Sequence, residues 1–336
     1  MLRLPAFKFV TPKSLREAAT VLADYQRTAL LVAGGTDVYP KLKRRQFQPL
    51  CLISVRRLRE LEGLQGSAAS GFMIGAGVTL AQVAEHPEIR AHYAGLSAAA
   101  GVVSTPVLRN MGTLGGNLCL DTRCNYYDQT HEWRQSIGWC KKAPGDGLTS
   151  EKVPCRVAPG SPKCLAVSST DTAPMLIALG AEVTLVNSKG ERRIPVDALY
   201  RNDGMNCLAK QPDEILTHIH LPPSDGVRSA YLKLRRRGAF DFPVLGAAVA
   251  LRFDGAVVRQ ARVALGGVAS YPIHVEAAAQ ALVGKPLSEE TIEAAAQAAF
   301  GPARPMDNTE YPLFYRKKMV PVYVKRALLE AAAGPS

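Results

Sequence analysis

The residues of this sequence best suited to chemistry are its cysteines, and they are unevenly spread. Five of the seven lie between residues 119 and 164: Cys119, Cys124, Cys140, Cys155 and Cys164. They follow directly on the glycine-rich motif GTLGGN at residues 112–117. An odd number of cysteines argues against a disulfide framework and favours metal binding or redox chemistry. The chain therefore joins a loop of ligand-binding type to a thiol-rich segment.

Four of these cysteines could hold one metal centre: Cys124, Cys140, Cys155 and Cys164. An iron–sulfur cube needs four converging thiolates, and long loops can supply them as well as C-x-x-C pairs can. The surrounding segment is rich in Pro, Gly, Lys and Asp and poor in aliphatic residues, so a metal site would be what orders it. Tetrahedral zinc is the main alternative, although zinc sites usually contain closely paired cysteines. The thiols could also carry no metal.

Other residues near this centre are weaker candidates. Cys119 adjoins the glycine motif and is left out of the ligand set, while Cys51 and Cys207 are expected to be ordinary thiols. His131 could replace one cysteine as a ligand. The pair Tyr126–Tyr127 follows the first ligand and could shield a cluster, pack on a flavin or simply lie at the surface.

Two glycine-rich loops are candidates for binding a cofactor. AGGTDV at residues 33–38 follows an apolar stretch, and GTLGGN is a second loop of the same kind. Glycines permit positive φ and close approach of the backbone, and consecutive amides can form an anion-binding concavity. Thr36 adds a hydroxyl donor, whereas Asp37 would repel a phosphate and is expected to orient the loop. Neither loop matches the dinucleotide fingerprint or the phosphate loop, and a plain strand-to-helix turn is the alternative.

Apolar patterning predicts alternating helices and strands in the first two thirds of the chain. Strands are expected near residues 29–33, 51–55, 72–77, 182–188, 192–196 and 214–221, and helices near residues 15–22, 94–103 and 171–181. Ser14 and Thr79 begin capping-box motifs. In the last third, the same patterning predicts strands near residues 230–237, 244–253 and 256–265, and helices near residues 275–283 and 289–299. A C-terminal helix is expected to break near Pro321.

Length and composition describe an ordinary globular protein with room for two domains. The chain has 336 residues, 47% of them hydrophobic and 21% charged, and a formal net charge of +12. Its basic residues are dispersed and no nucleic-acid motif accompanies them, so a nucleic-acid partner is not expected. No apolar run is long enough to span a membrane and no secretory signal is visible, so we expect a cytoplasmic protein without a membrane partner.

Six motifs, in order, resemble those of the FAD-binding medium subunits of the xanthine dehydrogenase and carbon monoxide dehydrogenase family, the molybdenum hydroxylases. They are LVAGGTDV, RNMGTLGGN, SSTD with ALGAEVTL, EILTHIHLP, YLKLRRR and the late YR at 315–316. The resemblance implies an α+β fold. A vanillyl-alcohol-oxidase-like (PCMH-type) FAD-binding domain of two α/β subdomains would span residues 1–222, divided near residue 57. A C-terminal α+β domain of the CO dehydrogenase flavoprotein type would span residues 223–330.

The resemblance also implies which residues contact FAD. The first loop would wrap the pyrophosphate, with Leu31, Val32, Ala33, Gly34, Gly35, Thr36, Asp37 and Val38. The second would add Thr113, Leu114, Gly115, Gly116 and Asn117. Asp171 would hold the adenosine ribose, Val103 and Leu216 would line the cofactor, and Lys233 would lie near it. Asp171 could instead cap a helix, Val103 and Leu216 could be plain core, and Lys233 could be solvated.

Residues 119–167 have the character of an insertion, because the family joins these motifs by a short link. Within the family the insertion resembles most that of the medium (beta) subunit of 4-hydroxybenzoyl-CoA reductase, which carries a [4Fe–4S] cluster at this place. The resemblance then implies an electron-transfer subunit for aromatic compound degradation. Electrons from ferredoxin would pass through [4Fe–4S] and FAD toward [2Fe–2S] and molybdenum, and the substrate would be dehydroxylated to benzoyl-CoA.

The implied partners are a molybdopterin-containing large subunit and a [2Fe–2S] small subunit, in a dimer of heterotrimers. No residue of this chain is expected to be catalytic toward the organic substrate, because no nucleophile, general base or acyl-CoA site is recognisable. One alternative is the FAD subunit of a different molybdenum hydroxylase, of the xanthine, CO or N-heterocycle dehydrogenase type, with a structural zinc insert. Another is a flavin oxidase that acts without partners.

Overall fold

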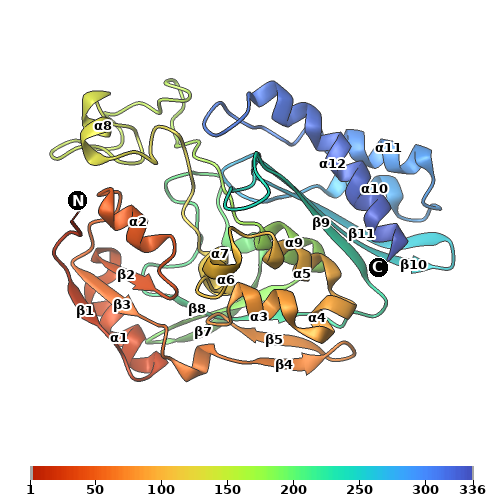
Figure 1. Cartoon of the computed structure of the whole chain (residues 1–336), viewed down its shortest axis with the longest axis horizontal. Coiled ribbons are helices and arrows are strands. Elements are labelled where there is room, and N and C mark those ends of the chain that lie inside the picture. Colours follow the sequence, from red (N-terminus) through yellow and green to blue (C-terminus); the bar gives the residue numbers. More distant parts are fainter. Residues whose placement is uncertain (1–2, 335–336) are drawn as a thin grey trace.

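The first unit of the computed structural model, which describes residues 3–334, is a small parallel sheet at the N-terminal end of the chain (Figure 1). Its strands are β1 (Lys8–Val10), β2 (Ala29–Val32) and β3 (Cys51–Ser54), with β3 in the middle. Helix α1 (Leu15–Tyr25) packs its apolar stripe against β3, and the short α2 (Val38–Lys43) follows β2. The first glycine loop is therefore the turn between β2 and α2.

The middle unit is a five-stranded antiparallel sheet covered by helices on one side (Figure 1). In sheet order the strands are β4 (Leu64–Ser67), β5 (Gly71–Gly75), β8 (Ile215–Leu221), β6 (Glu182–Asn187) and β7 (Gly190–Pro195). The helices are α3 (Leu80–Glu85), α4 (Pro87–His92), α5 (Ala94–Gly101), α6 (Pro106–Arg109), α7 (Leu114–Leu118) and α9 (Thr172–Leu179). The second glycine motif forms the start of α7.

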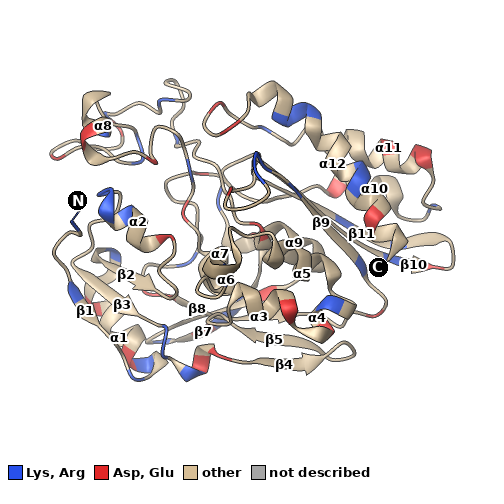
Figure 2. Ribbon diagram, viewed as in Figure 1, with Lys and Arg blue, Asp and Glu red and all other residues tan. Residues whose placement is uncertain are grey.

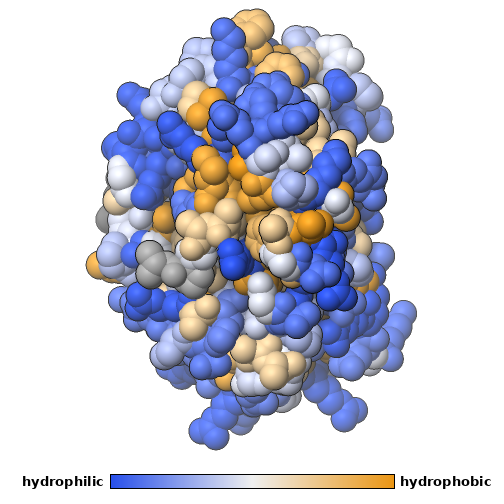
Figure 3. All heavy atoms as spheres, turned by 90° about the vertical axis from the view of Figure 1, so that its right-hand side faces the viewer, coloured by the Kyte–Doolittle hydropathy of each residue, from blue (hydrophilic) through white to orange (hydrophobic). Residues whose placement is uncertain are grey.

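The last unit is a four-stranded antiparallel sheet with three helices. Its strands, in sheet order, are β12 (Ile273–His274), β11 (Val257–Gly266), β10 (Leu245–Asp254) and β9 (Arg228–Leu234). The helices are α10 (Glu276–Leu282), α11 (Glu289–Ala298) and α12 (Leu313–Ala333). Residues of β9, β10 and β11 also join the core of the middle unit. An apolar area lies near the centre of the face on this side, with hydrophilic residues around it (Figure 3).

The segment from Cys119 to Val167 has little regular structure. Its one helix in the described part of the chain is α8 (His131–Ser136), and the remainder consists of loops and turns. Figure 1 shows this segment rising from the end of α7 and passing over the N-terminal unit, beside α2. Basic and acidic residues are interspersed over all units, with no single basic stripe (Figure 2).

Most predicted elements are present, but the predicted break near Pro321 is wrong. Helix α12 continues from Leu313 to Ala333 through this proline. Proline removes one backbone hydrogen bond, but buried side chains on both sides of it anchor the helix to the core: Val320, Val324, Ala327, Leu328 and Ala331. None of the helices within residues 3–334 combines the length and the apolar character needed to cross a membrane.

Candidate cofactor sites

The two glycine-rich loops, far apart in sequence, touch each other. A Cβ on Gly34 would lie 1.8 Å from the Met111 carbonyl oxygen, so only glycine permits this approach. A Cβ on Gly112 would lie 3.6 Å from the Thr36 hydroxyl. Gly35 has φ of +74°, where a side chain would also meet the Tyr39 ring. Residues 33–38 and 111–117 therefore lie side by side and are in contact.

The second loop is fixed by a network of hydroxyl and amide groups. Thr113 caps α7 by accepting a hydrogen bond from the Gly116 amide at 3.1 Å. The Asn117 Oδ1 atom accepts from the Thr170 hydroxyl at 2.7 Å, the Thr172 hydroxyl at 2.7 Å and the Thr172 amide at 3.2 Å. Because Thr170 and Thr172 flank Asp171, the structure places this predicted carboxylate close behind the second loop.

Two cavities adjoin the first loop. The larger, of about 780 Å³, is lined by residues of both loops and by the middle unit, including Gly34, Arg56, Thr79, Gln82 and Thr113. The smaller, of about 440 Å³, is lined by Gly35, Thr36, Tyr39, Pro40, Lys43 and Arg44. Glycine backbone, hydroxyls and cations together suit an elongated anionic ligand. Lys43, Arg44 and Arg56 were not predicted as site residues, although each belongs to a basic run visible in the sequence.

Asp171 and Lys233, both predicted as site residues, form a buried ion pair. The Lys233 ammonium lies 2.9 Å from Asp171 Oδ2, and both side chains are 3% exposed. The Tyr231 hydroxyl donates to Asp171 Oδ1 at 2.9 Å, and Lys233 also donates to the Val102 carbonyl at 3.1 Å. Burial raises the pKa of Asp171 and lowers that of Lys233. The attraction between the two charges acts in the opposite direction on both pKa values but is the smaller effect. Lys233 is therefore not a solvated strand residue.

The other predicted FAD residues occupy ordinary positions. Asp171 stands at the start of α9, but its side chain makes no capping hydrogen bond. Leu216 is buried in the core of the middle unit, and Val103 packs against the same core. Neither Leu216 nor Val103 lines the two cavities described above. The structure thus brings together the loops and the Asp171–Lys233 pair, and leaves these two apolar residues in the core.

The four predicted metal ligands are all buried within the inserted segment. Cys124 is 7% exposed, and Cys140, Cys155 and Cys164 are each 5% exposed. The Ala166 amide donates a hydrogen bond to the Cys164 sulfur at 3.4 Å. The backbone amides of Tyr126 and Tyr127 lower the pKa of Cys124, and those of Lys142 and Ala143 lower that of Cys140, each against the larger effect of burial. Such N–H groups stabilise negative charge on sulfur, as hydrogen bonds do at metal-bound thiolates.

These thiols lie near one another, but not in the shell of a single ion. Cys124, Cys140 and Cys164 belong to one small cluster with Tyr127 and Ala166. Cys164 also lies within electrostatic range of Cys155. Among residues 3–334, no three His, Cys, Asp or Glu side chains are grouped so that they could hold one metal ion. Burial raises the pKa of Cys124 to about 12 and that of Cys164 to about 11, so both are neutral thiols when no metal is bound.

The remaining cysteines and His131 lie outside this group. Cys51 is in the core of the N-terminal unit, and Cys119 packs against the core of the middle unit, within electrostatic range of Cys207. The His131 ring packs edge-on against Trp139, with centroids 4.9 Å apart. Tyr127 is 2% exposed, so it is not a surface aromatic.

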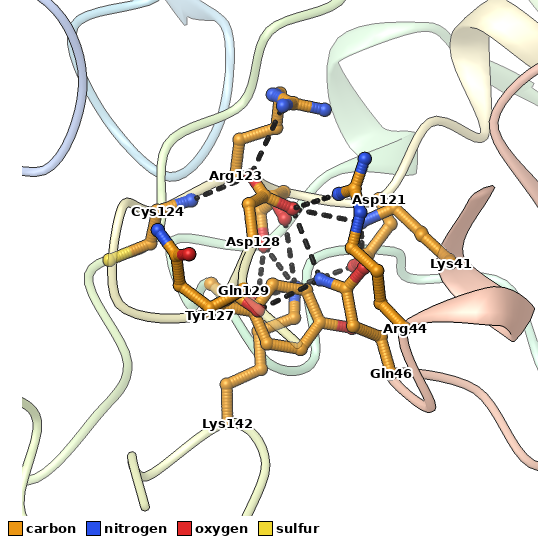
Figure 4. Close-up of polar contacts among 12 residues, drawn as sticks. Lys41, Arg44, Gln46, Asp121, Arg123, Cys124, Tyr127, Asp128, Gln129 and Lys142 are labelled. Carbon is orange, nitrogen blue, oxygen red and sulfur yellow. Dashed lines mark hydrogen bonds and ion pairs between the residues drawn. The ribbon is translucent and has the colours of Figure 1, made fainter. Parts of the chain in front are cut away.

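The inserted segment is fastened to α2, next to the first glycine loop, by buried charges (Figure 4). We call Lys41, Asp121, Asp128 and Lys142 the charge cluster. Lys41, 1% exposed, lies 3.0 Å from Asp121 Oδ2 and 3.7 Å from Asp128 Oδ1. Lys142 lies 2.5 Å from Asp121 Oδ1. The two ammonium groups stand over the Tyr127 ring, 4.8 and 4.7 Å from its centroid.

Replacing Asp121 with alanine is expected to release the inserted segment from α2. Burial alone would raise the pKa of Asp121, but Lys142 and Lys41 outweigh it and lower the pKa to about 2. Without this carboxylate, two buried ammonium groups lose their principal partner, which costs about 3–5 kcal/mol. Limited proteolysis of the full chain should then cut within residues 119–167 roughly a hundredfold faster.

Asp146→Ala is the matched control, because Asp146 is an exposed carboxylate of the same segment. Equal cleavage rates for Asp121→Ala and Asp146→Ala would contradict the role given to the charge cluster.

The pH dependence of the stabilisation by Asp121 has a definite sign, because the pKa of Asp121 in the folded protein lies below its ordinary value of 3.8. Its stabilisation is complete above that value and is lost as the pH falls toward 2.

Comparison with known proteins gives consistent matches along the chain. Residues 5–224 match the family model for the FAD binding domain in molybdopterin dehydrogenase, and residues 229–331 match that for the CO dehydrogenase flavoprotein C-terminal domain. The aldehyde oxidoreductase FAD-binding subunit of Escherichia coli is 30% identical, over 98% of this chain and 100% of the relative. The nicotinate dehydrogenase FAD-subunit of Eubacterium barkeri is 28% identical, over 96% and 95%.

Solved structures agree with these matches. A chain of the carbon monoxide dehydrogenase of Hydrogenophaga pseudoflava, in a form lacking the Mo-pyranopterin moiety of the molybdenum cofactor, superposes with a TM-score of 0.80. It is 28% identical and the match covers 98% of this chain and 99% of that chain. The α+β fold expected from the sequence, an FAD-binding domain followed by a CO dehydrogenase flavoprotein C-terminal domain, is confirmed.

Proposed function

Because this chain belongs to the FAD-binding medium subunits of the xanthine dehydrogenase and carbon monoxide dehydrogenase family of molybdenum hydroxylases, we propose that it is the electron-transfer subunit of such an oxidoreductase. FAD is the cofactor of its N-terminal family domain. When bound, FAD exchanges electrons with other redox centres, while the protein sets its position and surroundings. The observation that carries the proposal is the contact between the two glycine loops beside the larger cavity.

The proposed FAD contacts are those implied by the sequence, with additions from the structure. The backbone of residues 31–38 and 113–117 would face the anionic pyrophosphate, where glycine allows close approach. Lys43 and Arg44 would add positive charge beside Thr36, because all three line the smaller cavity. Asp171 would reach the ribose only if its bonds with Tyr231 and Lys233 are shared or exchanged, since both of its carboxylate oxygens already accept hydrogen bonds.

We further propose a molybdopterin-containing large subunit and a [2Fe–2S] small subunit as partners. The names of two relatives support this, because these proteins are called a medium chain and an FAD-subunit. A cytoplasmic location is part of the proposal, because none of the seven cysteines, all within the described residues, forms a disulfide, as is usual in a reducing compartment. Ferredoxin is the proposed electron donor.

The relatives favour the family-level reading over one particular substrate. Their names refer to an aldehyde, nicotinate and carbon monoxide. The narrower proposal of a 4-hydroxybenzoyl-CoA reductase depends on the inserted segment alone. Its substrate would meet the large subunit, so the site residues of this chain do not distinguish it from other members.

We propose that Cys124, Cys140, Cys155 and Cys164 hold a [4Fe–4S] cluster rather than zinc. A zinc ion with four thiolates needs sulfurs about 3.8 Å apart, because each zinc–sulfur bond is about 2.3 Å long. No side-chain group in the described residues could hold such a single ion. A four-iron cube takes each thiolate on a separate iron, so its ligands stand farther apart. The buried sulfurs and the amides directed at them fit this larger, negatively charged group.

Analysis of the anaerobically purified full chain tests the proposal. The expected result is FAD released on denaturation, with iron and acid-labile sulfide in matching amounts and little zinc. Zinc without sulfide would support the alternative of a structural metal in a different molybdenum hydroxylase. Reduced ferredoxin should bleach the bound flavin of the wild-type chain. An iron-free variant should be bleached by dithionite but not by ferredoxin, and equal bleaching by ferredoxin would remove the cluster from the pathway.

A further inference from the structure

Lys142 is the member of the charge cluster that also lies within electrostatic range of Cys140 and Cys164. Its ammonium donates to Asp121 Oδ1 at 2.5 Å and to the Gly204 carbonyl at 2.8 Å, and the side chain is only 6% exposed. The Gly204 amide in turn donates to the Cys164 carbonyl at 2.8 Å. Lys142 also follows Cys140 by two residues, and both its backbone amide and its ammonium lower the pKa of the Cys140 thiol against burial. One residue thus approaches two of the four cysteines.

Cations and carboxylates around Lys142 are shared rather than paired one to one, and Asp37 also lies within electrostatic range of Lys41 and Arg123. Asp121 is shared between Lys142 and Lys41, so one carboxylate serves two buried ammonium groups. Asp128 is likewise shared, by Lys41, Arg44 and Arg123. Figure 4 shows these side chains converging beside Cys124 and Tyr127. Because Lys142 shares the Asp121 carboxylate with Lys41, a negatively charged group nearby would stabilise its buried ammonium further.

We propose that Lys142 is a positioning residue that supplies counter-charge to the four-cysteine centre and thereby raises its reduction potential. The inference rests on the proposed iron–sulfur cluster. Four thiolates make such a centre negatively charged, and reduction makes it more so. A fixed cation therefore stabilises the reduced form more than the oxidised form. The low exposure of Lys142 keeps solvent from screening the effect.

A purely mechanical role for Lys142 is the rival account. In that account Lys142 would only fasten the loop around Cys140 to residues 121–122 and 204, through its contacts with Asp121, Thr122 and Gly204. Removing it would then lower the amount of cluster or the stability of the segment. The potential of the clusters that remained would not change, so the potential separates the two accounts.

The test is a potentiometric titration of the full chain, purified anaerobically and followed by low-temperature paramagnetic resonance. Lys142→Met removes the charge and keeps an apolar stem of similar length. At a fixed potential, this variant is expected to have a ratio of reduced to oxidised cluster at least tenfold lower than the wild type. A tenfold change corresponds to a reduction potential lower by about 59 mV for a one-electron couple. Lys142→Arg keeps the charge and should titrate close to the wild type. Lys152→Met, an exposed lysine of the same loop, is the matched control and should not shift.

The possible outcomes decide between the accounts. Lys142→Met with normal iron and sulfide but an unchanged potential overturns the inference and leaves the proposed function intact. Lys142→Met could also fail to hold a cluster. In that case, a Lys142→Arg variant that holds a cluster with the wild-type potential supports the inference, and a Lys142→Arg variant that holds no cluster overturns it. A wild-type chain without iron and sulfide removes the proposed cluster itself and the inference with it.

Discussion

Replacing Cys140 or Cys155 with alanine is expected to lower the iron and sulfide content of the full chain on the order of tenfold or more, while FAD stays bound. Each change leaves one iron of a cube without its protein ligand. The glycine loops do not depend on these thiols, because they are held by Asn117 and by contacts between the loops themselves. Iron and sulfide analysis, together with the flavin absorbance of the same samples, measures both effects.

Cys51→Ala is the control for this experiment. Cys51 is fully buried in the N-terminal unit, away from the inserted segment, so its replacement should leave iron and sulfide unchanged. An unchanged cluster signal in Cys140→Ala or Cys155→Ala would remove that residue from the ligand set. The outcome for Cys140 and Cys155 matters most, because they bound the longest gap between successive candidate ligands that contains no helix.

Replacing Gly34 with alanine is expected to lower the affinity for FAD at least tenfold. The new methyl group would lie 1.8 Å from the carbonyl oxygen of Met111 and 2.5 Å from its carbonyl carbon. Both atoms belong to the backbone, so no side-chain rotation relieves the clash and the two loops must separate. Overpacking of this kind costs about 1–3 kcal/mol or more, and each 1.4 kcal/mol is about tenfold in affinity. Titration of the FAD-free chain with FAD measures the effect.

Gly160→Ala is the matched control, because a Cβ at that exposed glycine meets nothing within 4 Å. It should bind FAD as the wild type does. Wild-type affinity in Gly34→Ala would show that contact between the glycine loops is not needed for FAD binding. The site proposed between them would then have to be abandoned.

Local sequence patterns predicted most of the helices and strands, because each signal acts over a few residues. The Thr79–Gln82 capping box is an example, and it is present. The short strand β1 has no distinctive pattern and was missed; it forms because Lys8–Val10 pairs with β3. Pro321 misled the prediction because tertiary packing of α12 outweighs a local preference against helix.

The candidate site was predictable residue by residue but not as an arrangement. Asp171 and Lys233 were both singled out, yet nothing in their spacing indicated that they pair with each other. Lys41 and Asp121 were not predicted as site residues, since charged residues are usually solvated. Their burial depends on the inserted segment folding back onto α2, a contact between residues far apart in the chain. Substrate identity is not predictable from these residues, because none of them is proposed to meet the organic substrate.

The paramagnetic resonance spectrum of the full chain, reduced with dithionite and recorded at low temperature, tests the central claim most directly. That claim is that four buried thiolates hold an iron–sulfur cube on a segment docked beside an FAD site. The account predicts the signal of a reduced [4Fe–4S] cluster, in amounts that match the bound FAD and that fall when Cys124 or Cys164 is replaced. A flavin-loaded chain with zinc in place of iron, and without this signal, would contradict it.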